Sequence, residues 1–152
     1  LSAEQLLDAV CRVTGLTESF EGLPAGTRAT ALPSPQMNHA FLKTFGQPSR
    51  NTACTCERAT EPQLAQALEF LSGKLVHGKL ESANNRFRKG MAAGNSDHEI
   101  VRELYWTALS RPPSTGELTS ARRHIAGASD RAAALTDVCW AILNTNEFVF
   151  QH

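Results

Sequence analysis

The sequence lacks the features that would place it in several large classes of protein. Its 15 Lys and Arg residues balance 15 Asp and Glu residues, so it has no net charge and no basic footprint of a nucleic-acid binder. Its longest apolar run near the C-terminal end, 138–143, is far shorter than the roughly 20 residues that a membrane-spanning helix needs. The sequence therefore predicts neither a nucleic-acid partner nor membrane insertion.

Known catalytic motifs are missing as well. The chain contains no Gly-rich phosphate loop, no Gly-x-Ser-x-Gly elbow, no His-Glu-x-x-His motif and no Cys-x-x-Cys-His haem attachment sequence. Four cysteines are too few and too scattered for a disulfide scaffold. We therefore assign no catalytic residue and no cofactor, and leave open whether the domain belongs to an enzyme.

What is present describes an ordinary globular chain. With 152 residues, 41% of them hydrophobic and 20% charged, the chain can bury a substantial core without cross-links. It opens at Leu1-Ser-Ala-Glu4, without an initiator Met or a signal-like segment. We expect residues 1–152 to form a single helical domain that is the C-terminal piece of a longer multidomain chain.

Helices are marked by caps and by apolar spacing. Capping-box pairs three residues apart predict helices that begin after Ser2, Ser96 and Ser114. Further helices are predicted at 61–72, 74–80 and 85–93, and a last long one from Ser129 or Asp130 to Asn144, followed by a closing turn that docks Phe148. The helix after Ser96 has the widest apolar stripe and is expected to be the central core helix; the stripe consists of Ile100, Val101, Leu104, Tyr105, Ala108 and Leu109.

Residues 16–60 differ from the rest because they hold four of the seven prolines. Within this segment only 38–45 shows a helical pattern, and His39 at its start is interpreted as a surface residue. No stretch alternates long enough to predict a strand. The predicted fold class is all-α: an irregular bundle of six or seven helices with a long Pro/Gly-rich loop, at about 16–60, wrapped on one side.

One local cluster suggests chemistry, namely Cys54, Cys56, Glu57 and Arg58. Thiols at i and i+2 fall on the same side of an extended segment, where they can share a soft metal ion, oxidise to a strained disulfide, or pack unreactively. Zinc normally takes four ligands, and no second Cys or His pair has matching spacing, so the metal question stays open. The cluster is the candidate functional site.

Two tryptophans form a second candidate. Trp106 and Trp140 each fall just beside the apolar stripe of their predicted helix. They are interpreted either as packing at the edge of the core or as an exposed aromatic surface for a sugar or a protein partner.

Several blocks together resemble the C-terminal part of the planctomycete-specific domain of unknown function, found in large secreted proteins that also carry planctomycete cytochrome-c-type domains. The resemblance covers nearly the whole chain, and its most specific block is Cys54-x-Cys-Glu-Arg58. The other blocks are Leu1-Ser-Ala-Glu-Gln-Leu-Leu-Asp-Ala-Val with Val13-Thr-Gly, Leu23-Pro-x-Gly-x-Arg28, Phe41-Leu-x-x-Phe-Gly-x-Pro48, Glu61-Pro with Gln66-Ala-Leu, Leu104-Tyr with Leu109-Ser-Arg-Pro-Pro, and Trp140-Ala-Ile-Leu-Asn-x-x-Glu-Phe.

The resemblance implies an extracytoplasmic location, periplasmic or secreted, and upstream domains of the same polypeptide, including cytochrome-c-type domains, as partners. An oxidising compartment would allow Cys54 and Cys56 to be disulfide-bonded. Two functions follow as alternatives. The first is a non-catalytic interaction or scaffold module of a secreted bacterial multidomain protein, with a carbohydrate or protein partner. The second is part of an extracytoplasmic enzyme, polysaccharide-processing or electron-transferring, whose other active residues lie upstream.

Overall fold

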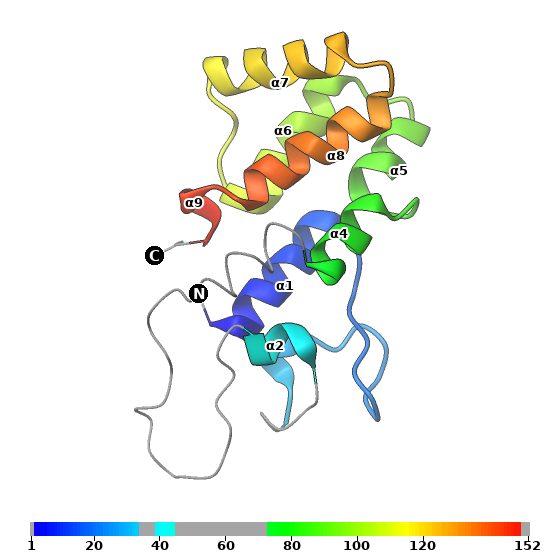
Figure 1. Ribbon diagram of the computed structural model, residues 1–152, viewed down its shortest axis with the longest axis vertical. Coiled ribbons are helices and arrows are strands. Elements are labelled where there is room, and N and C mark those ends of the chain that lie inside the picture. The colour runs from blue at the N-terminus through cyan, green and yellow to red at the C-terminus, as the bar shows by residue number, and fades with distance from the viewer. Residues whose placement is uncertain (1, 34–38, 45–72, 150–152) are drawn as a thin grey trace.

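The computed structural model describes residues 2–33, 39–44 and 73–149, and all regular structure within these ranges is helical (Figure 1). No strand occurs in them, so the prediction of an all-α fold is confirmed. The predicted helix at 61–72 lies outside the described residues. The elements are α1 (Ala3–Thr14), the 3-10 turn η1 (Ala29–Ala31), α2 (Ala40–Thr44), α4 (Lys74–Glu81), α5 (Arg86–Ala92), α6 (Asp97–Leu109), α7 (Thr115–Gly127), α8 (Arg131–Leu143) and α9 (Asn146–Val149).

The three predicted capping boxes are all formed. Ser2, Ser96 and Ser114 each accept a hydrogen bond from the backbone N–H three residues later, and the Gln or Glu there accepts one from the serine's own N–H. These reciprocal bonds satisfy backbone donors that a helix leaves unpaired in its first turn. The starts of α1, α6 and α7 therefore follow from local sequence.

Helix α6 is the centre of the bundle, as its apolar stripe predicts. It packs against α1, α5, α7, α8 and α9, and in Figure 1 it lies behind α8 with α7 alongside. Ile100, Val101 and Leu104 are at most 1% exposed. Burying an aliphatic side chain to this extent stabilises the fold by about 1.5–3 kcal/mol. Helix α6 therefore carries much of the core.

Helix α1 connects this core to the N-terminal part of the chain. Its residues Leu7 and Val10 are fully buried, and it contacts α2, η1, α4 and α5 as well as α6. Gly15 ends the helix with a left-handed conformation, φ +70°, which a side chain would make strained. In Figure 1, α1 and α2 lie toward the opposite end of the long axis from α7. Helix α1 thus presents one flank to α6 and another to η1.

Two local predictions need correction. His39 was expected on the surface, but its side chain is only 16% exposed and its ring lies 5.5 Å from that of Phe20. The 16–60 segment was expected to be ordered only at 38–45, yet η1 forms within it and Ala29 is 2% exposed. Both features depend on contacts with distant parts of the chain, which the local pattern does not contain.

Candidate functional site

The predicted cluster of Cys54, Cys56, Glu57 and Arg58 lies outside the described residues. Its geometry therefore stays a prediction, and so does the choice between metal binding, disulfide formation and plain packing. Within the described ranges, no group of three or more His, Cys, Asp or Glu side chains could hold a metal ion. In the same ranges, none of the helices has the length and apolar character needed to cross a membrane.

The two cysteines that the structure describes are free thiols without signs of activation. Burial raises the pKa of the Cys11 thiol, with a smaller opposing effect from the charge of Lys79 and its hydrogen bond. Cys139 is fully buried in α8, and burial alone raises its pKa to about 12. The thiolate is the reactive form of cysteine. Burial thus favours the protonated thiol over the thiolate at both positions.

Lys79 organises the surroundings of Cys11. Its ammonium, on a side chain only 10% exposed, lies 2.9 Å from Glu18 Oε2 and donates a 3.1 Å hydrogen bond to the carbonyl of Thr17. The other oxygen of Glu18 lies 3.9 Å from His39 Nε2. A buried ammonium needs such partners to offset its lost hydration. The group therefore fastens the segment after α1 to α4, which is a structural role.

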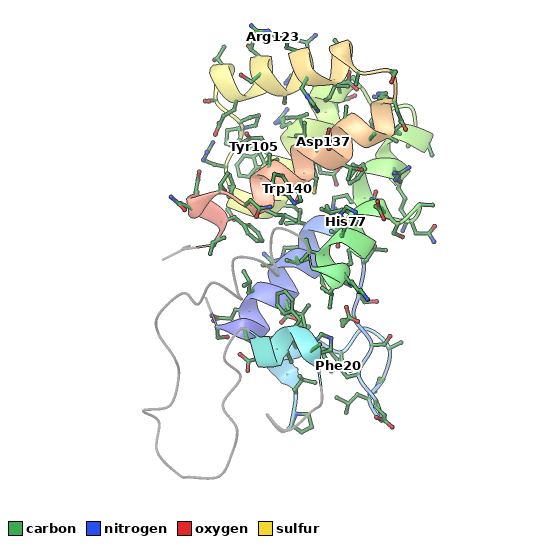
Figure 2. All side chains as sticks on the ribbon, in the orientation of Figure 1. Phe20, His77, Tyr105, Arg123, Asp137 and Trp140 are labelled. Carbon is green, nitrogen blue, oxygen red and sulfur yellow. The ribbon has the colours of Figure 1, made fainter. Side chains whose placement is uncertain are left out.

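The two tryptophans differ in their surroundings. Trp106 on α6 is 49% exposed. Trp140 on α8 is half-buried and packs against the core (Figure 2). Trp106 is thus the one of the two that presents a large aromatic surface to solvent.

A pocket that the sequence did not predict lies between α1, η1 and the C-terminal end of α6. Its cavity volume is about 280 Å³. Polar and apolar surface contribute about equally to its lining, which consists of Gln5, Asp8, Ala9, Arg12, Arg28, Thr30, Thr107, Ala108 and Ser110. Residues from three separated parts of the chain converge here, so only the folded structure could reveal the site.

The wall formed by η1 is built by a tight turn. Thr27 donates hydrogen bonds from its backbone N–H and its hydroxyl to the carbonyl of Pro24, at 3.2 and 2.7 Å. Gly26 within the turn has φ +83°, a conformation that favours glycine. The turn places Arg28 immediately before η1, at its N-cap. The turn therefore positions Arg28 in the lining of the pocket, which explains the block Leu23-Pro-x-Gly-x-Arg28.

Asp8 fixes this wall to α1. Its Oδ1 accepts a 2.7 Å hydrogen bond from Ala29 N–H. Its Oδ2 accepts bonds from the N–H and the hydroxyl of Thr30, at 3.2 and 2.7 Å. Hydrogen bonds to an ionised carboxylate are among the stronger ones in proteins. The charge of Asp8 is thus engaged in holding η1.

Unlike Asp8, whose charge is engaged with η1, the two arginines of the pocket have no charged partner among the described residues. Neither the Arg12 nor the Arg28 guanidinium forms an ion pair within residues 2–33, 39–44 and 73–149, and both side chains are exposed. Each guanidinium carries five N–H donors in a planar fork suited to carboxylate, phosphate or sulfate groups. With no acidic partner among the described residues, these two cations on one concave surface can receive an anionic or hydrogen-bonding ligand.

Arg111, on the connection between α6 and α7, has the opposite character. Its Nε and Nη2 donate to Glu147 at 2.6 Å, and its Nη1 and Nη2 donate to Glu117 at 2.9 Å. The remaining Nη1 hydrogen bonds to the Pro112 carbonyl at 3.1 Å, and the guanidinium lies 5.6 Å from the Tyr105 ring centroid. All five donors are engaged, so this group, called the Arg111 clamp below, is structural.

Comparison with known proteins identifies a family for this chain. A family model described as PSD1, protein of unknown function (DUF1553), matches residues 1–125. No curated protein and no solved structure matches the chain. The matched residues include every residue that lines the pocket.

Proposed function

We propose that this chain, which belongs to the PSD1 family of proteins of unknown function, is a non-catalytic interaction module of a secreted multidomain protein. In this role the pocket between α1, η1 and α6 holds a polar group of the partner. The exported location and the upstream domains are proposals that rest on the sequence resemblance alone.

The observation that carries the proposal is the state of the two arginines in the pocket. Other arginines with distant partners, such as Arg111 and Arg131, direct their donors at acidic side chains of neighbouring helices. Arg12 and Arg28 line a cavity instead and have no ion-pair partner in the described ranges. Charged side chains at a concave site with open donors are typical of ligand binding.

A non-catalytic role is supported by the state of the thiols that could act as nucleophiles. Burial holds the pKa values of Cys11 and Cys139 above the ordinary value. The polar groups of the pocket are a carboxylate fixed by three donors, two guanidiniums, an amide and hydroxyls. Such groups bind and orient a ligand, and the carboxylate that accepts the Thr30 hydroxyl, Asp8, also accepts two backbone N–H bonds that hold it in a structural role.

The test blocks the pocket without disturbing the fold. Thr107→Phe fills it from α6, and Thr119→Phe is a matched control, because both threonines donate their hydroxyl to the carbonyl four residues earlier. A panel of soluble oligosaccharides and peptides is titrated against each protein by isothermal calorimetry, and the ligands are then recovered and weighed by mass spectrometry. We expect at least one ligand that binds the control, fails to bind Thr107→Phe and is recovered unchanged. Binding unaffected by Thr107→Phe, or a chemically altered ligand, would refute the proposal.

A further inference from the structure

We infer that the pocket between α1, η1 and α6 binds an acidic sugar, with the carboxylate or sulfate group held between Arg12 and Arg28. This inference rests on the proposed function, since it names the ligand class of the same pocket. It follows from the hydrogen-bonding capacity of the lining, from its charge, and from an exposed tryptophan one helical turn from the lining residue Ser110.

The lining has more free donors than free acceptors. The hydroxyls of Thr30 and Thr107 already donate, to Asp8 Oδ2 and to the Glu103 carbonyl, and Gln5 Oε1 already accepts from Ser2 N–H. Within residues 2–33, 39–44 and 73–149, the donors that remain for a ligand are the Gln5 amide N–H₂, the Ser110 hydroxyl and the two guanidiniums. A ligand rich in acceptor oxygens satisfies these donors, and an oxyanion offers the most acceptors in the least volume.

The charge of the lining is positive but modest. Two guanidiniums face one carboxylate, that of Asp8, which already accepts three hydrogen bonds from η1. The C-terminal end of α6 adds a negative partial charge of about half an elementary charge. The balance favours a ligand with a single negative group over a polyphosphate. Such binding weakens with salt, because Arg12 and Arg28 are exposed.

Size and surroundings point to a sugar ring as the carrier of the oxyanion. A volume of about 280 Å³ holds about nine water molecules at ~30 Å³ each, which is room for one small polyhydroxy ring. The Ser110 N–H bonds to the Trp106 carbonyl, so Trp106 lies one helical turn before the pocket residue Ser110. Trp106 is 49% exposed and offers an apolar aromatic face one helical turn from Ser110, outside the lining itself. Sugars combine hydroxyls with an apolar C–H face and match this pairing.

The experiment titrates the full chain with three oligosaccharides of equal length: an oligogalacturonate, a sulfated oligogalactan and a neutral oligogalactan. Calorimetry is run at low and at high NaCl concentration, with sodium acetate and sodium sulfate as sugar-free arms. We expect one acidic oligosaccharide to bind at least about tenfold more tightly than the neutral one, and high salt to weaken it. Whichever acidic oligosaccharide binds more tightly shows whether the pocket prefers a carboxylate or a sulfate group.

Variants assign the effect to the pocket. Arg28→Ala should weaken acidic binding about tenfold or more, and Arg28→Lys should weaken it less, because lysine keeps the charge but not the fork. Arg123→Ala on α7 removes the same charge far from α1 and should bind as the wild type does (Figure 2). Circular dichroism of each variant checks that the fold is retained.

The outcomes separate this inference from the proposed function. If the neutral sugar binds the wild type as tightly as the acidic sugar does, and does not bind the Thr107→Phe variant, the inference is overturned and the interaction role stands. If acetate or sulfate binds as tightly as the matching oligosaccharide, the claim that the ligand is a sugar is overturned. If Arg28→Ala binds the acidic oligosaccharide as tightly as Arg123→Ala does, the claim that Arg28 holds the oxyanion is overturned. No binding by any ligand would overturn the inference, and the wider panel with Thr107→Phe then decides the proposed function.

Discussion

Replacing Arg111 with glutamine should destabilise the fold in a pH-dependent way. The side chain joins the α6–α7 connection, the start of α7 and α9 through its bonds to Glu117 and Glu147. Hydrogen bonds from Arg111, opposed by burial and aided by Ser114, lower the pKa of the Glu117 carboxyl from 4.5 to about 2. The same arginine lowers the pKa of Glu147.

The magnitude follows from the Glu117 shift. At about 1.4 kcal/mol for each tenfold change in acidity, the difference between a pKa of 4.5 and one of about 2 corresponds to at most about 3–4 kcal/mol. About a third of each side chain is exposed, 36% for Arg111 and 32% for Glu117, so solvent screens the interaction. We therefore expect Arg111→Gln to lower the free energy of unfolding by about 1–2 kcal/mol at pH 7.

The sign of the pH dependence is fixed by the direction of the shift. A carboxyl with a lower pKa in the folded state stabilises the fold above its unfolded pKa, and this stability is lost as the pH falls from about 4.5 toward 2. More than about half of the Glu117 contribution should be lost by pH 3. The gap between wild type and Arg111→Gln should therefore narrow between pH 5 and pH 3.

The assay is urea denaturation followed by circular dichroism at pH 7, 5 and 3. Arg122→Gln on the exposed face of α7 removes the same charge and serves as the control. A gap between wild type and Arg111→Gln that stays constant from pH 7 to pH 3 would refute the reasoning, because it would show that the Arg111 clamp does not act through the carboxylates. A loss no larger than that of Arg122→Gln at pH 7 would do the same.

Three further predictions concern the core, the segment after α1 and the cysteine pair. Leu104→Ala, at a position 1% exposed, should lower the free energy of unfolding by about 2–5 kcal/mol in urea titration, and a loss below about 1 kcal/mol would mean that α6 is not the central core helix. Lys79→Met should lower the free energy of unfolding by about 1–3 kcal/mol by removing the ammonium that lies 2.9 Å from Glu18, and hydrogen exchange should speed up in residues 15–28 before it does in α6. Cys54→Ser and Cys56→Ser should each admit limited proteolysis within residues 16–60 before the bundle unfolds, with thiol counts and metal analysis of the native protein as companion measurements; unchanged cleavage, four free thiols and no metal would leave the pair as plain packing.

Helices marked by capping boxes and apolar spacing could be predicted from the sequence. Helix α6 begins where Ser96 and Glu99, three residues apart, form a capping box, and its apolar stripe repeats at helical spacing. The same holds for α1, which begins directly after Ser2 as its capping box predicts. These signals act over one or two turns, so neighbouring residues suffice to read them.

The pocket and the Arg111 clamp depend on pairing between distant residues. Asp8 meets Ala29 and Thr30 across 21 and 22 positions, and Arg111 meets Glu147 across 36. The Pro and Gly of the Leu23–Arg28 block indicate a turn, but the turn alone does not say that Arg28 faces α1 and α6. A single sequence contains no signal for which acidic residue an arginine will meet.

The Arg111 clamp also has a consequence for the opening of α9. Glu117 lies six residues after Arg111, in the first turn of α7, and Glu147 lies 36 residues after it, in α9. When α9 frays, the Nε donor and one Nη2 donor of Arg111 lose their acceptor, while the bonds to Glu117 remain. Opening of α9 is therefore coupled energetically to the α6–α7 connection, although the two segments are far apart in the sequence.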